Sequence, residues 1–197
     1  MGVARIGEGC GMTNLFSRRR LVILACSATK RDGPDYMPAI ERYDGPLWKT
    51  LRAANPDGRY AAVAFLSAHL GFRAASTTIE LYDARMTQDR ADAMKAGGLG
   101  TRWPRPKTKR LVVEGGEHPG MHIASLTEYA RRPFSDVAIV GGHLYLDVMR
   151  HLVGLFGEAG HLTPDVQVTE INGEIGRMRQ ALRLWLQVGF TGDRGQS

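Results

Sequence analysis

The sequence predicts an α/β fold, a single-domain, three-layer Rossmann-like fold with a mostly parallel sheet. The chain has 197 residues and 43% hydrophobic composition, which suits one domain with one core. Three short apolar runs, at 21–25, 61–67 and 136–140, are typical of strands buried on both faces. Helical stretches separate these runs, and this alternation favours right-handed βαβ units around a parallel sheet.

Turn-forming and capping residues bound the elements expected in the first half of the chain. Pro46 suits the first turn of a helix, which the turn at 55–58 ends. Thr87 is a candidate N-cap, and the glycine pair at 97–98 ends the helix that follows. The expected elements are a strand at 21–25, a helix at 46–54, a strand at 61–67 and a helix from 87 through 94.

The second half begins with a long basic loop and then returns to alternating elements. The loop covers 98–110 and has no apolar periodicity. A final helix is expected after the glycine turn at 173–176, with one apolar stripe formed by Ile175, Met178, Leu182 and Trp185. The other expected elements are a short strand at 111–113, a helix at 123–131, strands at 136–140 and 166–171, and a helix at 144–156.

The domain is expected to span 21–190, between a flexible leader at 1–20 and a flexible tail at 191–197. Met12 is an alternative start to Met1. We find no secretory signal and no apolar run of the ~20 residues that span a bilayer, so we expect a cytoplasmic protein without a membrane partner. Cys10 and Cys26 are too few for a disulfide framework or a zinc site, and we predict neither a metal nor a cofactor.

Net charge and one loop point to polyanionic partners. The chain carries +6 at neutral pH, with a pI of about 9.6. Such a charge is compatible with a nucleobase, nucleotide or nucleic-acid partner, although arginine-rich composition alone also produces it. Cations around one aromatic ring suit an arm that contacts phosphates and stacks on bases, and a solvated loop is the alternative. The candidate nucleic-acid-binding residues are Arg102, Trp103, Arg105, Lys107, Lys109 and Arg110.

Polar and glycine residues follow the predicted strands, and ligands of parallel α/β sheets bind beyond the carboxyl ends of strands. Short polar side chains and backbone N–H groups there suit an anion or the polar edge of a base. Each residue also has a structural reading, such as ordinary strand-to-helix packing for the glycine pair. The candidate ligand-binding residues are Ser27, Lys30, Tyr43, Ser67, Gly71, Gly141, Gly142, Tyr145 and Glu170.

Three residues near these strand ends are candidates for catalysis. Cys26 is a nucleophile candidate if a nearby cation activates it, although a cysteine at a strand end is usually a small buried hydrophobe. His69 is a candidate general acid or base, or else a histidine bonded to loop backbone. Asp83 is a candidate to orient His69, hold a lysine or accept from a base amino group, or it is a turn residue or cap.

Several short motifs occur in a fixed order along the chain. They are Cys26-Ser27 with Lys30, Pro38-Ala39 with Tyr43, Gly45-Pro46-Leu47-Trp48, Leu66-Ser67-Ala68-His69 with Gly71, Tyr82-Asp83, Gly142-His143-Leu144-Tyr145, and Asn172 to Gly176 before the final helix. Their order resembles a family of bacterial and phage α/β proteins related to the YaaA-like superfamily. The matching segments cover about 21–187, and the basic loop near Trp103 is longer here than the family pattern needs.

The resemblance implies nucleic-acid or nucleobase chemistry. YaaA-like relatives are linked to peroxide stress and DNA binding. The catalytic domain of archaeosine synthase has a similar Cys-Ser-x-x-Lys strand end and acts on a 7-deazaguanine base in tRNA. We therefore expect an enzyme for base modification or glycosidic-bond chemistry, and the alternatives are a non-catalytic nucleic-acid-binding protein of stress type and a nucleotide-sensing module.

Overall fold

The chain forms an α/β fold built on a five-stranded sheet, in the order β4-β3-β1-β6-β7. The computed structural model describes residues 19–101, 103–104, 121–127 and 132–188. The strands of the sheet are β1 (Arg20–Ala25), β3 (Ala62–Ser67), β4 (Gly71–Ala74), β6 (Phe134–Val140) and β7 (Leu162–Ile171), and β2 (Met37–Pro38) and β5 (Thr78–Ile79) form a separate antiparallel pair. The helices are α1 (Ala39–Arg42), α2 (Pro46–Ala54), α3 (Gln88–Gly97), α4 (His143–Glu158) and α5 (Ile175–Val188), with 3₁₀ turns at Pro56–Gly58 and Met121–Ile123.

Four of the five strands are parallel, and β1 lies in the middle of the sheet. It pairs in parallel with β3 on one side and β6 on the other, and β7 pairs in parallel with β6. Its residues 21–24 are fully buried, as expected of a continuous apolar run covered on both faces. Among the described strands, the antiparallel strand β4 pairs only with β3 and forms one edge.

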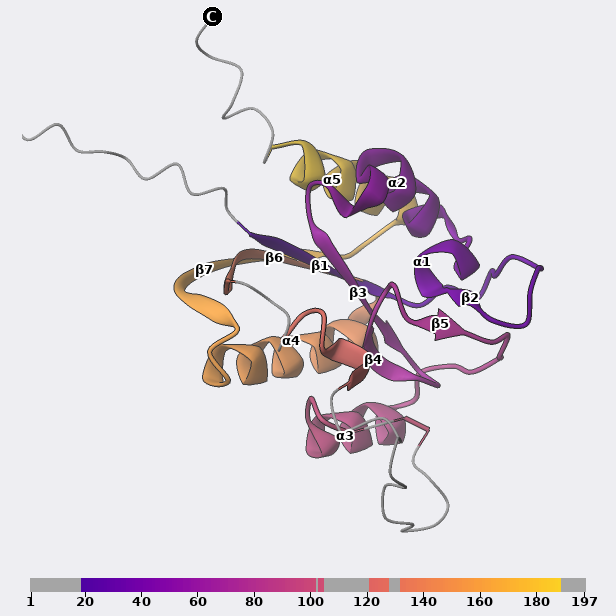
Figure 1. Cartoon of the computed structure of the whole chain (residues 1–197), viewed down its shortest axis with the longest axis horizontal. Helices are drawn as coiled ribbons and strands as arrows, with labels where there is room; N and C mark the ends of the chain where they lie inside the picture. The colour runs from indigo at the N-terminus through magenta and orange to yellow at the C-terminus, as the bar shows by residue number, and fades with distance from the viewer. Residues whose placement is uncertain (1–18, 102, 105–120, 128–131, 189–197) are drawn as a thin grey trace, which may run out of the picture.

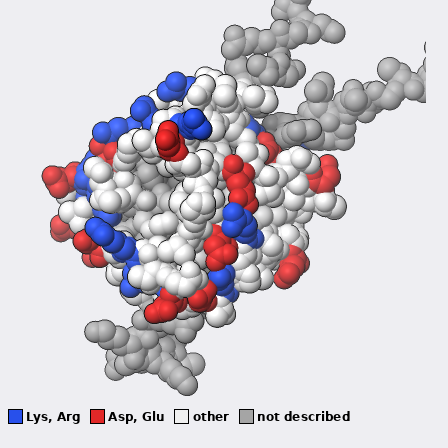
Figure 2. All heavy atoms as spheres, turned by 180° about the vertical axis from the view of Figure 1, so that it is seen from behind, with Lys and Arg blue, Asp and Glu red and all other residues white. Residues whose placement is uncertain are grey.

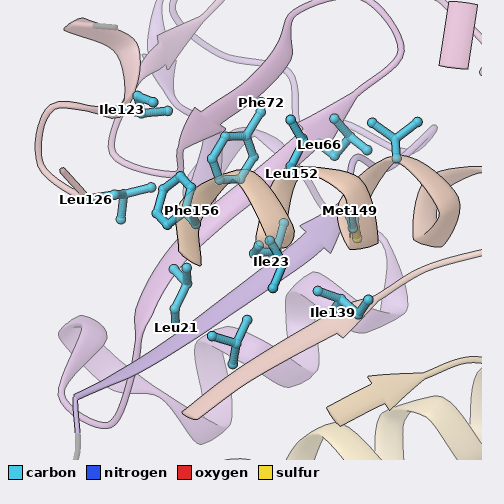
Figure 3. Close-up of a cluster of buried hydrophobic side chains, with 14 of the residues drawn as sticks. Leu21, Ile23, Leu66, Phe72, Ile123, Leu126, Ile139, Met149, Leu152 and Phe156 are labelled. Carbon is cyan, nitrogen blue, oxygen red and sulfur yellow. The ribbon is translucent and has the colours of Figure 1, made fainter. Parts of the chain in front are cut away.

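Helices cover both faces of the sheet, so the hydrophobic core has two parts (Figure 1). Helices α2 and α5 pack on one face, and α3 and α4 pack on the other. Figure 3 shows the part of the core on the α3 and α4 face, where side chains of α4 meet those of β1, β4 and β6. Phe72 and Phe156 meet there edge to face, with ring centroids 5.7 Å apart. No helix of the described residues is both long and apolar enough to cross a membrane.

Most of the predicted elements are confirmed, with ends that differ from the predicted ones by up to four residues. Pro46 begins α2, and Thr87 caps α3 by accepting a hydrogen bond from the backbone N–H of Arg90. Gly98 then ends α3 with a φ of +68°, a conformation that glycine adopts without steric cost. The strand predicted at 166–171 is the carboxyl-terminal part of the longer edge strand β7.

Three details of the prediction need correction. The leader was predicted to reach residue 20, but Arg20 belongs to β1 and its side chain is buried. Ile175 is 49% exposed and does not join the buried stripe of α5, in which Leu186 is buried instead. A helix was predicted at 123–131, but the described part of it, 123–127, is a 3₁₀ end followed by a turn.

The predicted strand at 111–113, much of the basic loop and the tail at 191–197 lie outside the described residues. The same holds for Arg102, Arg105, Lys107, Lys109 and Arg110. These assignments stay predictions.

Gly71 begins β4 in a conformation and a space that only glycine fits. Its φ is +68°, and a Cβ atom there would lie 2.6 Å from Cδ1 of Trp103. Gly58 has the same φ of +68° with no atom within 4 Å of the corresponding Cβ position. Both alanine variants carry the cost of a left-handed conformation, about 1–2 kcal/mol, but only Gly71→Ala must also displace an indole ring.

We therefore expect Gly71→Ala to lower the free energy of unfolding clearly more than Gly58→Ala does. Urea unfolding of the two variants measures this difference. Equal losses would mean that Trp103 does not cover Gly71.

Candidate functional site

The centre of the candidate site lies where the strand order reverses direction. The chain passes from β1 to its neighbour β3 and then crosses to β6 on the other side of β1. Helix α2 follows β1 on one face, and α4 follows β6 on the opposite face. The loops that leave β1 and β6 therefore diverge, and this is the position at which α/β sheets bind ligands.

Cys26 and Tyr145 contact each other at this position. Cys26 is the first residue after β1, and Tyr145 lies in the first turn of α4. The Cys26 sulfur is 3.3 Å from the Tyr145 hydroxyl oxygen, and both side chains are half-buried. Gly141 allows this approach, because a Cβ there would lie 3.0 Å from the Cβ of Ala25 and 3.2 Å from that of Tyr145. Gly142 forms the N-cap of α4 and has open space beside it.

Ser67 closes the turn after β3 and fixes the direction of one hydrogen bond. The side chain is fully buried, and its oxygen accepts from the backbone N–H groups of His69 and Leu70, both at 3.0 Å. A hydroxyl oxygen has two acceptor lone pairs and one donor hydrogen. Because both lone pairs are occupied, the Ser67 hydroxyl donates to the Tyr82 oxygen, which lies 2.7 Å away.

Tyr82 connects the segments of the site. Its hydroxyl bonds to the fully buried Tyr43 as well as to Ser67. Its ring stacks on His69 with centroids 4.9 Å apart, and the Lys30 ammonium lies 4.3 Å from the ring centre. Lys30 is held there because it forms an isolated antiparallel bridge with Tyr43. Residues from four separate segments therefore meet at one phenol.

The phenols of the site stay protonated at neutral pH. Burial raises the pKa of Tyr43, Tyr82 and Tyr145 above the ordinary value, and the neighbouring Cys26 raises each pKa further. Protonated phenols are hydrogen-bond donors as well as acceptors. The site thus offers neutral donors beside a thiol, with the Lys30 cation over one of the phenol rings.

His69 is held mainly in its neutral form at neutral pH. Partial burial lowers its pKa, and the positive charges of Arg90 and Arg73 lower it further. We expect Arg90→Gln to raise this pKa, because removal of a nearby cation favours the imidazolium ion. An NMR titration of the His69 ring protons measures the change, with Arg183→Gln on the exposed surface of α5 as the matched control. A pKa that is equally shifted in both variants would contradict the placement of Arg90.

The structure brings together most of the residues predicted at the strand ends. Cys26, Ser67, His69 and Tyr145 surround the Tyr82 phenol directly or through one neighbour. Ser27 is half-buried against Gly45, the N-cap of α2, where a Cβ would meet the serine side chain.

Four other predicted residues lie in different surroundings. Asp83 is exposed, and among the described residues no hydrogen bond joins it to His69. Glu170 forms a surface ion pair with Arg150 of α4, at 2.6 and 2.7 Å. Trp103 is half-buried against the core and lies over Gly71, which is therefore covered by the indole.

Two residues of the site, Tyr82 and Arg90, are not among the predicted site residues. The segment of Tyr82, 80–87, has neither helical nor alternating apolar spacing. Arg90 lies half-buried in the first turn of α3, where a cation has no distinguishing sequence signal. Tertiary packing alone places both near His69.

The cluster combines a thiol, an imidazole and phenolic donors, a set that suits nucleophilic or acid–base chemistry on a small polar ligand. Comparison with known proteins adds no relative, because no family model, no curated protein and no solved structure matches this chain.

Proposed function

We propose that this protein is an enzyme that acts on a nucleobase or nucleotide, through base modification or glycosidic-bond chemistry. One observation carries the proposal: Cys26 and Tyr145 meet at the strand-order reversal, and the Lys30 ammonium lies over the ring of Tyr82 in the same cluster. Doubly wound sheets bind nucleotides at such a reversal. The parallel strands β3-β1-β6-β7 follow the order of such a fold, and this supports assignment to the Rossmann-like class.

The proposed roles follow from the chemistry of each group. Lys30 makes no ion pair with any described residue, so its ammonium is free to bind a phosphate or a ring nitrogen. Cys26 is the candidate nucleophile, and His69 is the candidate proton acceptor because its lowered pKa keeps it neutral. The phenols of Tyr82 and Tyr145 orient the ligand by hydrogen bonding. Asp83 and Glu170 have no role in this proposal.

A thermal-shift screen of the full chain against nucleobases, nucleosides, mononucleotides and short oligonucleotides tests the proposal. We expect a small base-containing compound to raise the Tm. Lys30→Ala should weaken its binding about tenfold, since a hydrogen bond to a charged group contributes about 1.5–3 kcal/mol. Arg183→Ala, which removes an exposed cation on α5, should leave binding unchanged.

Two outcomes would count against this function. If none of the small base-containing compounds raised the Tm, the proposal of a nucleobase or nucleotide substrate would be contradicted. Stabilisation by oligonucleotides alone, insensitive to Lys30→Ala and lost with salt, would favour a nucleic-acid-binding protein. On the face shown in Figure 2, basic and acidic side chains are interspersed and no continuous basic surface forms among the described residues.

A further inference from the structure

A groove of about 360 Å³ opens beside the site, between the segment that precedes β2 and the residues that follow β5. This volume lies within the range of roughly 300–1,000 Å³ that is typical of small-molecule pockets. Figure 1 shows β2 and β5 side by side, beyond the end of the sheet toward which β1 runs. The groove is lined by 33–36, Arg42, Glu80 and Leu81.

Two residues that line the groove, Glu80 and Leu81, are close neighbours of the candidate site. Leu81 immediately precedes Tyr82, the phenol at which the site residues meet. The negative charge of Glu80 also acts on His69, where it opposes the lowering of the histidine pKa. Glu80 and Leu81 of the groove therefore lie close to His69 and Tyr82 of the candidate site.

A buried guanidinium holds the wall of the groove in place. Arg42 is fully buried and donates hydrogen bonds to the backbone oxygens of Arg31, Pro34 and Asp35. These contacts fix the loop that carries Tyr36. The groove is therefore formed before any ligand binds, which reduces the ordering cost of binding.

The open side of the groove combines a carboxylate, that of Glu80, with the exposed side chains of Tyr36 and Leu81. Tyr36 is 63% exposed and Leu81 is 54% exposed. The Tyr36 phenol donates to the Glu80 carboxylate, and this hydrogen bond raises the tyrosine pKa. Glu80 makes no ion pair with any described residue, and a carboxylate offers about four acceptor positions. Acceptor positions of Glu80 therefore remain open to a ligand.

We infer that this groove takes the base of the substrate and selects bases with an exocyclic amino group. The inference rests on the proposed function and adds a substrate class to it. Tyr36 and Leu81 provide surfaces against which a planar ring packs, as aromatic side chains do for single bases. Glu80 accepts from the amino group, because an ionised carboxylate has only acceptors. A base with a carbonyl oxygen at that position brings two acceptors together and binds less well.

Matched pairs of mononucleotides test the inference on the full chain. Cytidine and uridine 5′-monophosphates differ by an amino group against a carbonyl, and adenosine and inosine 5′-monophosphates differ in the same way. Isothermal titration calorimetry should give at least about tenfold tighter binding for the amino member of one pair, since a good polar base contact discriminates by about 1–3 kcal/mol. Glu80→Gln should reduce this ratio to near one, because an amide also donates.

Two further variants separate selectivity from general affinity. Leu81→Ala should weaken both members of a pair to the same extent, since Leu81 contributes only an apolar packing surface to the groove. Glu174→Gln, an exposed carboxylate before α5, should leave the ratio unchanged.

Equal affinities within each pair for the unmodified protein, or a ratio that Glu80→Gln leaves intact, would overturn the inference. Nucleotide binding that still depends on Lys30 would in that case leave the proposed function standing. Failure of every nucleotide to bind would contradict both this inference and the proposed function.

Discussion

Asp136→Asn is expected to lower the free energy of unfolding by about 3–5 kcal/mol, the usual cost of breaking a buried ion pair on one side. Asp136 on β6 accepts from Arg20 at 2.8 Å through one oxygen and from the Trp185 indole at 3.1 Å through the other. The asparagine amide has one acceptor atom and one donor group, so its NH₂ faces a donor in either orientation. The Arg20 guanidinium also loses its only carboxylate partner among the described residues while it stays buried.

The surface pair Arg150–Glu170 provides the matched control. Its two side chains are 49% and 40% exposed, against 6% and 15% for Arg20 and Asp136. Glu170→Gln should therefore cost less than about 1 kcal/mol. Chemical unfolding of both variants gives the comparison, and similar losses would contradict the importance of burial for the Arg20–Asp136 pair.

Tyr82→Ala is expected to lower the free energy of unfolding by about 3 kcal/mol, the lower end of the range for a buried aromatic side chain, because Tyr82 is only partly buried. The ring contacts His69 and Lys30, and the hydroxyl bonds to Tyr43 and Ser67. Tyr82→Phe keeps the ring and removes only the hydroxyl. It should cost about 1–3 kcal/mol, because the buried Tyr43 and Ser67 hydroxyls lose a partner.

Tyr36→Phe is the control for removal of a tyrosine hydroxyl at the surface. Its phenol is exposed, and we expect a change within about 0.5 kcal/mol. Thermal and urea unfolding measure all three variants. If Tyr82→Phe were no more destabilising than Tyr36→Phe, the hydroxyl cluster would not stabilise the fold.

The central strands could be predicted because burial on both faces leaves a continuous apolar run in the sequence. Such runs mark β1, β3 and β6. Strand β4 has no such mark, since it contains only four residues, one of them an arginine, and begins at a glycine. Its pairing with β3 depends on tertiary contacts that local sequence does not encode.

The prediction of a helix at 123–131 was wrong in the described part of that segment, and tertiary contacts again give the reason. Ile123, Ala124 and Leu126 are all buried, so the segment inserts a turn into the core instead of presenting one apolar face. Pro133 follows shortly after and disfavours helical backbone in the residue before it. Apolar residues alone did not distinguish these two arrangements.

For the candidate site, the sequence predicted the edge of the sheet at which the residues lie. It did not predict which side chains contact one another there. Cys26, Ser67 and Tyr145 were predicted because each follows a recognisable strand. Glu170 also lies at a strand end, but its side chain points toward Arg150 on α4, and the sequence alone does not settle which face a strand residue takes. Tyr82 comes from a segment without regular structure, so only the folded chain shows that it joins the cluster.

Ligand protection of Cys26 tests most directly whether the ligand binds at the strand-order reversal, beyond the carboxyl ends of β1 and β6. In a Cys10→Ser protein Cys26 is the only thiol, and mass spectrometry follows its reaction with iodoacetamide with and without each mononucleotide. We predict that a nucleotide that raises the Tm slows labelling of Cys26, and that Lys30→Ala removes the protection while Arg183→Ala retains it. A nucleotide that stabilises the protein but leaves the labelling rate unchanged would place the ligand elsewhere and contradict the account.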